Sequence, residues 1–159
     1  WLIVERSRKR EGSGMAKYTH TIDAKGRIFI PSKLRGELGS PVYVTHSLDE
    51  GYLAGYASRP FDAIRDQIAG LSGTDPLVRE MRREIIGEAM ACDVDSQGRI
   101  GISEELWNHI GVKPGDEIFI IYMFDKLEIC SKAFYEQKRK EGGPPLTAQD
   151  LTRYDVKGL

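Results

Sequence analysis

The chain has 159 residues, of which 40% are hydrophobic and 30% are charged, and its formal net charge is −1. This size fits one compact domain or two small, closely packed ones, and the apolar runs are too short for a membrane span. The charge balance excludes nucleic-acid binding through general basicity, so any such site must be local and multiplied by oligomerisation.

Residues 1–14 differ in character from the rest of the chain. They contain the basic run from Arg6 to Arg10 and end in a Gly-Ser-Gly segment directly before Met15. We therefore expect them to be an extension upstream of a start at Met15, and a basic DNA-binding arm is the alternative.

A short motif near the start of the chain predicts a turn followed by a strand. Asp23 can accept hydrogen bonds from backbone N–H groups two residues later, and Gly26 permits a positive φ. Arg27 comes next, and the alternation of Ile28 with Ile30 is typical of a half-buried strand. The chain thus presents an arginine at the end of a tight turn.

The remainder of the first half predicts a helix, a hairpin and a linker. Ser32 opens a short helix, with its hydroxyl as the candidate cap, and β-rich runs over residues 41–56 predict a hairpin. Ser58 is expected to cap a longer helix. Asp75-Pro76 then suits the start of a further helix, which would link the two halves.

The motif of residues 23–39 recurs 72 residues later, over residues 95–111, with seven of the seventeen positions identical. Such a repeat indicates one supersecondary unit used twice. Arginine is a planar fork of donors that suits phosphate and guanine edges. A turn needs the Asp and the Gly but not the Arg, so the retained Arg99 favours a function over the alternative, a solvated arginine on an ordinary hairpin turn.

The second half continues in the same order as the first. Ser103 is the candidate cap of its short helix, a hairpin is expected over residues 117–130, and Ser131 opens the next helix. From Glu141 a Gly-Gly-Pro-Pro run interrupts the chain, and we expect a mostly disordered tail in which Thr147 caps one short turn.

These residues carry a resemblance to a known family. The stretch from Gly98 to Ile118 is similar to the swapped-hairpin DNA-binding module of transition-state regulators and many antitoxins. The stretch from Tyr18 to Arg35 is similar to the opening of MraZ, a bacterial family with two such modules in one chain. The resemblance runs from about Met15 to about residue 140.

The resemblance implies a β-rich α+β fold. Two pseudo-symmetric swapped-hairpin halves, each of the AbrB-like double-psi-type barrel class, would be joined by a helical linker. The expected parts are the extension 1–14, a first AbrB-like module 15–72, a linking helix 73–88, a second AbrB-like module 89–140 and a flexible tail 141–159.

The resemblance also implies a function. The chain would be a sequence-specific DNA-binding transcriptional regulator, usually a repressor, that assembles into a homo-oligomeric ring (an octamer or similar). It would bind short direct repeats of double-stranded DNA in its own upstream promoter, ahead of the division and cell-wall gene cluster, in the cytoplasm and associated with the nucleoid. The alternatives are an antitoxin-like protein-interaction module and a non-specific nucleoid-associated ring.

Ten residues would carry DNA binding in this interpretation. The Asp and Gly residues shape the turns, the two motif arginines are the principal contacts, Lys25 and Gln97 assist, and two cations of the first helix contact phosphate. The set is Asp23, Lys25, Gly26, Arg27, Lys33, Arg35, Asp95, Gln97, Gly98 and Arg99. Because the helix after the second turn is acidic at Glu104 and Glu105, we expect the first half to contribute more affinity.

We expect no enzyme, no metal, no cofactor and no small-molecule substrate. His20, His46 and His109 lack the spacing of metal ligands, and the chain has neither a phosphate-binding loop nor a nucleophile elbow. Cys92 and Cys130 are interpreted as reduced, half-buried thiols rather than metal ligands or a disulfide.

Overall fold

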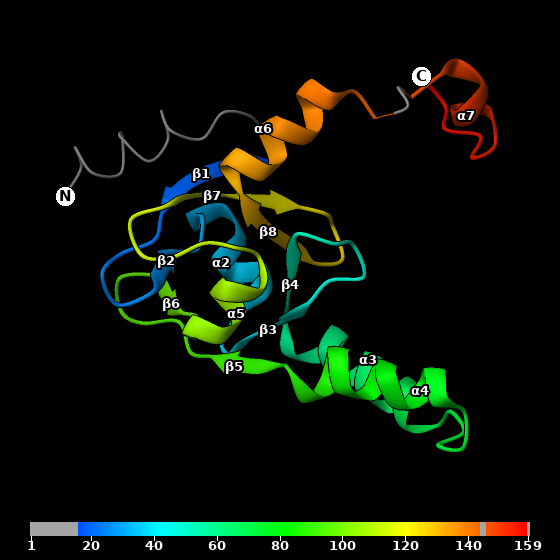
Figure 1. Ribbon diagram of the computed structural model, residues 1–159, viewed down its shortest axis with the longest axis horizontal. Helices are drawn as coiled ribbons and strands as arrows, with labels where there is room; N and C mark the ends of the chain where they lie inside the picture. The colour runs from blue at the N-terminus through cyan, green and yellow to red at the C-terminus, as the bar shows by residue number, and fades with distance from the viewer. Residues whose placement is uncertain (1–15, 144–145, 159) are drawn as a thin grey trace.

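The computed structural model describes residues 16–143 and 146–158 of the chain. The expected extension over residues 1–14 lies outside the described residues. The fold is a β-rich α+β arrangement (Figure 1). Its strands are β1 Lys17–Thr21, β2 Arg27–Phe29, β3 Val42–His46, β4 Tyr52–Tyr56, β5 Met90–Cys92, β6 Arg99–Gly101, β7 Glu117–Tyr122 and β8 Leu127–Ser131.

The helices connect the strands in the order that the sequence predicts. They are α2 Ser32–Leu38, α3 Ser58–Ala69, α4 Pro76–Met81, the π-helix η1 Arg82–Gly87, α5 Glu104–His109, α6 Lys132–Glu141 and α7 Ala148–Thr152. Helices α2 and α5 are the last elements of the two motif copies and lie at equivalent positions of the repeat. The division into modules with the bounds given above remains a prediction.

The two repeats exchange strands in a six-stranded antiparallel sheet of order β1-β7-β8-β4-β3-β5. Strand β1 of the first repeat pairs with β7 of the second, with Lys17 opposite Ile121. Strand β5 of the second repeat pairs with β3 of the first, with Val42 opposite Cys92. Because each repeat supplies an edge strand to the other, the sheet belongs to both.

Strands β2 and β6 form a separate two-stranded antiparallel ribbon. Ile28 lies opposite Ile100, its own equivalent 72 residues later, and Arg27 and Phe29 lie opposite Gly101 and Arg99. This register is symmetric about the Ile28–Ile100 pair. A pseudo-two-fold axis therefore passes through the centre of the ribbon and relates the two repeats.

The sheet does not close into the barrel that the resemblance implied. Among the described residues, β1 and β5 are the outer strands and do not pair with each other. The physical reason is that β2 and β6, the short strands that follow the turns, pair with one another instead of joining these edges. The predicted double-psi-type barrel is corrected to an open sheet with a ribbon.

One hydrophobic core serves both repeats. It includes Ile28 and Ile100 of the ribbon, Leu34 of α2 and Trp107 of α5, together with inward-facing residues of the six-stranded sheet. Trp107 is only 1% exposed. Since residues of both repeats fill the same core, neither repeat has a separate interior to fold around.

The linker helix α4 and the preceding helix α3 form the arm that extends away from the sheet in Figure 1. Asp75 caps α4 by accepting a hydrogen bond from the Leu77 N–H, as the sequence predicts. The arm is tied back to the sheet at η1, because the Thr45 hydroxyl donates to the Ile85 carbonyl at 2.6 Å. Arg82 donates to the Leu71 carbonyl at 2.9 Å and so joins the two sides of the arm.

The helix caps follow the prediction in the second half but not in the first. Ser103 and Ser131 accept hydrogen bonds from backbone N–H groups of α5 and α6, and Thr147 forms a reciprocal capping box with Asp150 in α7. Ser32 and Ser58 already lie inside their helices. The N-cap positions before them belong to Pro31 and Ala57, which supply no side-chain cap.

The central isoleucine pair generates a stability prediction. Ile28 and Ile100 are each 1% exposed and join the repeats at the pseudo-two-fold axis. We expect Ile100→Ala to lower the free energy of unfolding by about 2–5 kcal/mol, because the surrounding core cannot fully collapse into the cavity. Chemical denaturation followed by the fluorescence of buried Trp107 measures this.

The matched control for that prediction is Leu48→Ala. Leu48 is 88% exposed, and its truncation should change the unfolding free energy by less than about 0.5 kcal/mol. Equal effects of the two variants would contradict a shared core organised on the ribbon.

Candidate nucleic-acid interface

The first turn, residues 23–26, is built by one carboxylate. Oδ1 of Asp23 accepts hydrogen bonds from the backbone N–H groups of Lys25 and Arg27, both at 2.9 Å. Oδ2 accepts from Nε of Arg27 at 2.7 Å. The Gly26 N–H closes the turn by donating to the Asp23 carbonyl. The carboxylate therefore shapes the backbone and orients the arginine at the same time.

The second turn, residues 95–98, repeats this geometry. Oδ1 of Asp95 accepts from the backbone N–H groups of Gln97 and Arg99 at 2.9 Å, and Oδ2 accepts from Nε of Arg99 at 2.9 Å. In both turns the ion pair uses Nε. Within the part of the chain that the structure describes, the terminal nitrogens of Arg99 and of its counterpart Arg27 make no other hydrogen bond. Each guanidinium can thus donate its terminal N–H groups to a ligand.

The two arginines lie on the same face of the ribbon. Successive side chains of a strand point to opposite faces, so Arg27, Phe29, Arg99 and Gly101 share one face while the isoleucines occupy the buried one. The arginine side chains are 30% and 19% exposed. The ribbon presents two oriented cations to the outside.

On this face, the structure explains one difference between the two motif copies. The Arg99 guanidinium lies over the Phe29 ring, 5.9 Å from its centroid. The equivalent of Phe29 in the second copy is Gly101, and a Cβ there would lie 3.7 Å from Cγ of Arg27. Arg99 therefore packs over an aromatic ring, whereas Arg27 packs over the backbone of a glycine.

The hydrogen bonds lower the pKa of both turn carboxyls. Burial raises the pKa of Asp23, but hydrogen bonds from the backbone and side chain of Arg27 and from the Lys25 backbone outweigh it. For Asp95, the backbone hydrogen bond from Arg99 is the largest cause of a lowered pKa, with burial opposing it. Both carboxyls are held in the charged form that orients the arginines.

The helix of each repeat lies against the turn of the other repeat. Trp107 of α5 donates from Nε1 to the Gly26 carbonyl at 3.0 Å. Arg35 of α2 covers the second turn so closely that a Cβ at Gly98 would overlap its guanidinium. Both glycines have positive φ, +78° and +80°, as the turns require.

Because each helix contacts the turn of the other repeat, the reasoning behind the predicted difference in DNA affinity between the halves changes. Acidic α5 lies beside the first turn, and α2, with its cations Lys33 and Arg35, follows the first turn but contacts the second. The sequence connects each helix with the turn that precedes it. Lys33 is exposed, whereas Arg35 is partly buried and donates from Nε to the Ile30 carbonyl at 3.0 Å.

A groove of about 370 Å³, which we call the α5 groove, adjoins the first turn. Lys25 and Gly26 line it from the first repeat, and Glu104, Trp107 and Lys113 line it from the second. The surroundings of the first turn are therefore built by both repeats and include a carboxylate.

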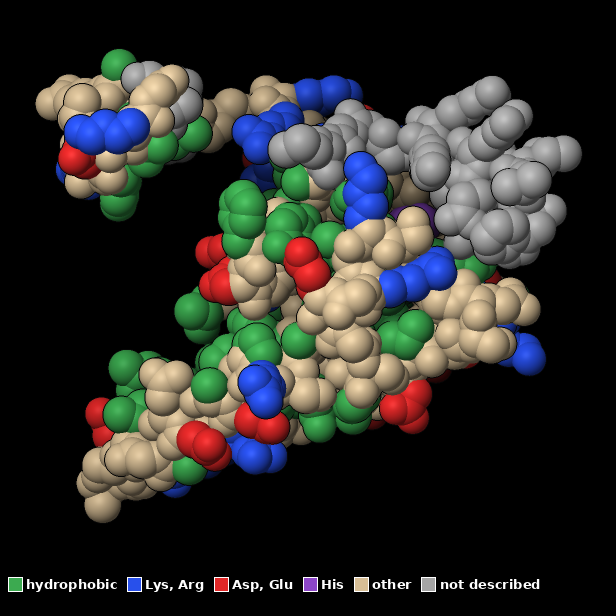
Figure 2. Space-filling model, turned by 180° about the vertical axis from the view of Figure 1, so that it is seen from behind, with side chains coloured by type: hydrophobic (Ala, Val, Ile, Leu, Met, Phe, Trp, Pro, Cys, Tyr) green, Lys and Arg blue, Asp and Glu red, His purple; other side chains and the backbone are tan. Residues whose placement is uncertain are grey.

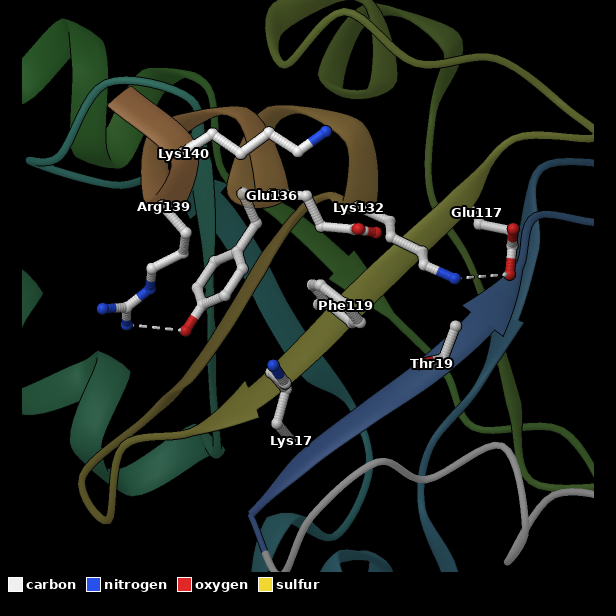
Figure 3. Close-up of a pocket in the computed structure, with 9 residues that line it drawn as sticks. Lys17, Thr19, Glu117, Phe119, Lys132, Glu136, Arg139 and Lys140 are labelled. Atoms are coloured by element: carbon white, nitrogen blue, oxygen red, sulfur yellow. Dashed lines mark hydrogen bonds and ion pairs between the residues drawn. The ribbon is translucent and has the colours of Figure 1, made fainter. Parts of the chain in front are cut away.

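Other cations of the described residues lie on the side shown in Figure 2 and in one further groove. On the side shown in Figure 2, Lys and Arg side chains are spread among Asp and Glu side chains. A second groove of about 620 Å³, the α6 groove, is lined by β1, β7 and α6 (Figure 3). There Lys132 pairs with Glu117, Arg139 donates to the Tyr135 hydroxyl and Lys17 lies over two aromatic rings. Its principal cations have internal partners, unlike the terminal nitrogens of the turn arginines.

Two histidines that are far apart in the sequence come together in the fold. The rings of His46 and His109 stack with their centroids 3.5 Å apart, and Nδ1 of His46 lies 2.7 Å from Oε2 of Glu84. The hydrogen bond with His46 lowers the pKa of Glu84. This cluster joins β3, α5 and η1, and no spacing rule could have paired residues so distant in the sequence.

Other sequence expectations concern metals, membranes and thiols. The described residues contain no group of three or more His, Cys, Asp or Glu side chains placed to hold a metal ion. Within the same ranges, no helix is both long and apolar enough to cross a bilayer. Cys92 and Cys130 are free thiols, fully rather than half buried, and burial raises the pKa of each to about 12.

Comparison with known proteins gives a consistent family match. Residues 15–84 and 85–156 each match the family model described as "MraZ protein, putative antitoxin-like". A solved structure, the solution structure of PHS018 from Pyrococcus horikoshii, aligns over 73% of this chain and 87% of that chain at 19% identity, but its TM-score of 0.31 is too low to establish a common fold.

Curated relatives agree with the family model. "Transcriptional regulator MraZ" of Lachnoclostridium phytofermentans is 38% identical over 122 residues, which cover 77% of this chain and 84% of the relative. The protein of the same name from Caldicellulosiruptor bescii is 35% identical over 74% of this chain and 80% of its own. The one from Shewanella frigidimarina is 31% identical over 82% and 87%.

The turn carboxyls generate a prediction about pH. Their folded-state pKa values lie below the ordinary 3.8, so their stabilising effect is present above 3.8 and is lost as the pH falls through the lowered values. We expect the free energy of unfolding to decrease over that acidic range. The double variant Asp23→Asn/Asp95→Asn should show a shallower decrease in denaturation curves recorded at several pH values.

The control for this measurement is Asp66→Asn, which changes a carboxylate that is 77% exposed. Its pH profile should match that of the unmodified chain. A double turn variant with an unchanged acid profile would show that the two carboxylates do not hold the turns.

Proposed function

This chain belongs to the MraZ family, and we propose that it is a transcriptional regulator that binds double-stranded DNA with the β2–β6 ribbon. The observation that carries the proposal is the pair of arginines on one face of the ribbon, each held by its own aspartate through Nε. The names of the relatives describe regulators and not enzymes.

The dimensions of the ribbon support a DNA ligand. The major groove of B-DNA is about 12 Å wide and admits a two-stranded β-ribbon. A guanidinium whose terminal nitrogens are free can bind the O6 and N7 acceptors of guanine or a phosphate in a two-pronged geometry. Lys25 and Gln97, both exposed at the turns, would add contacts at the two ends of the ribbon.

The short reach of one ribbon supports binding by an oligomer. From strand geometry, the Cα atoms of Arg27 and Arg99 are roughly 8 Å apart, which spans only two or three base pairs. One chain therefore cannot specify a long operator. We propose that several chains, assembled as a ring, read successive short direct repeats, and that their combined contacts supply the affinity that each lacks.

The proposal includes the setting that the family resemblance implies. The DNA is the promoter upstream of the chain's own gene, in the cluster for division and cell-wall synthesis, and the protein acts as a repressor in the cytoplasm, associated with the nucleoid. The exchange of β1 and β5 between the repeats supports the swapped-hairpin interpretation of each module.

A partner protein bound at the C-terminal segment is the competing function. Leu146, Tyr154 and Val156 expose 83%, 71% and 51% of their surface around α7, and the family description includes the term antitoxin-like. Removal of residues 144–159 separates the two functions, because the ribbon keeps every contact described above. DNA binding that survives this truncation supports the regulator.

The turn arginines generate a prediction about DNA affinity. We expect Arg27→Ala and Arg99→Ala each to weaken binding to a labelled duplex from the chain's own upstream region by about 1–3 kcal/mol. Each phosphate that is no longer neutralised should also reduce the magnitude of the negative slope of log K against log salt by about 0.9. Fluorescence anisotropy over a series of salt concentrations measures both quantities.

Two controls define the result. Arg139→Ala removes a cation of the α6 groove that is bonded to Tyr135, and it should leave affinity and salt slope unchanged. Competition with a duplex of random sequence distinguishes specific binding from a non-specific ring. If the unmodified chain does not bind the duplex at low salt, the proposed function is wrong.

A further inference from the structure

We propose that the two DNA-binding turns are each positioned by the opposite repeat, with Trp107 holding the first turn and Arg35 holding the second. The inference rests on the proposed function for its effect on DNA, and on the geometry alone for its effect on the turns. It adds Trp107 as a positioning residue and makes Arg35 a residue of the second DNA contact rather than the first.

The contacts of Trp107 support its role at the first turn. Its indole N–H donates to the Gly26 carbonyl at 3.0 Å, and the Ile102 N–H donates to the same oxygen at 3.1 Å. A Cβ at Gly26 would lie 3.4 Å from the indole nitrogen. Since Trp107 is 1% exposed, its position is fixed by the core, and the turn is fixed by Trp107.

Arg35 occupies the same place in the other half of the molecule. It lies 72 residues before Trp107, so the two are equivalent positions of the repeat. Its guanidinium covers Gly98, while its Nε donates to the Ile30 carbonyl at 3.0 Å. The Ile30 N–H in turn donates to the Gly98 carbonyl at 2.8 Å. Arg35 is therefore connected to the second turn through Ile30, the residue that follows strand β2 in the same repeat.

The crossing gives the two turns different charge. The first turn has both Glu104 and Lys113 of the opposite repeat in the adjoining α5 groove, so the opposite repeat adds no net positive charge there. The second turn has the guanidinium of Arg35 against its glycine. The second turn is therefore the stronger phosphate contact, which reverses the order expected from the sequence, where the acidic helix was assigned to the second turn.

The first arm of the test measures amide hydrogen exchange in the full chain without DNA. Trp107→Phe keeps an aromatic ring and removes the N–H donor, and it should accelerate exchange at Lys25, Gly26 and Arg27 but not at the second turn. Arg35→Gln should accelerate exchange at Gly98 and Arg99 but not at the first turn. Effects on the turn of the same repeat, equal effects on both turns or no effect would overturn the proposal.

A third variant separates positioning from charge. Arg35→Trp gives the first repeat the residue that the second repeat carries, so an indole N–H can reach the Gly98 carbonyl as Trp107 reaches that of Gly26. The second turn should keep its protection against amide exchange. The magnitude of the negative salt slope of DNA binding should fall by about 0.9, because one phosphate is no longer neutralised. An unchanged slope would show that Arg35 contributes no charge to the contact.

The second arm measures DNA affinity in double-variant cycles with the same upstream duplex. Trp107→Phe should weaken binding about 3- to 10-fold, as expected for the removal of one hydrogen bond. Combined with Arg27→Ala it should add little, because both changes act on the first turn, whereas combined with Arg99→Ala the two effects should multiply. Arg99→Ala alone should weaken binding more than Arg27→Ala.

The two arms fail in different ways. If the chain does not bind the duplex, the proposed function is wrong and the exchange arm still decides whether the support is crossed. If DNA binds but Trp107→Phe couples to Arg99→Ala instead of Arg27→Ala, the proposed function stands and the crossed support is wrong.

Discussion

The antiparallel pairing of β2 with β6 determines how the two repeats are related. Because Ile28 pairs with its own equivalent Ile100, the repeats face each other across a pseudo-two-fold axis, and β1 and β5 each pair with a strand of the opposite repeat. The same axis places the motif arginines on one face and sends each short helix across to the opposite turn. A chain with two side-by-side repeats would have separate cores and independent turns.

Each arginine is held by a carboxylate, which has opposing effects on a DNA contact. The aspartate offsets part of the positive charge that attracts phosphate. It also fixes the guanidinium through Nε, so less side-chain entropy is lost when the terminal nitrogens bind an acceptor. With a net charge of −1, this protein has little general attraction for nucleic acid. Because 24 acidic residues balance the 23 Lys and Arg residues, preorganised arginines at one site suit this chain better than a diffuse basic surface.

The sequence predicts local features of this protein well and relations between the repeats poorly. The Asp-to-Gly turns, the strands after them and the Asp75 cap follow from residue types within a few positions of one another. The open sheet and the support of Gly26 by Trp107 depend on contacts between the two repeats, and Gly26 and Trp107 are 81 residues apart. Because the two motif copies predict the same turn, strand and helix, nothing local indicates which helix lies beside which turn. For this reason the sequence connects the acidic residue Glu104 with the second turn, whereas the fold places it beside the first.

The exchange of strands also has a consequence for biosynthesis. β1 leaves the ribosome early, but its partner β7 follows only after about 100 further residues, which takes roughly 5–20 seconds at usual translation rates. During that interval β1 lacks its partner and β3 waits for β5, so the nascent first repeat exposes unpaired strand edges. Native structure must therefore form late, when nearly the whole chain has been made. Chaperone shielding would matter most while only the first repeat has emerged.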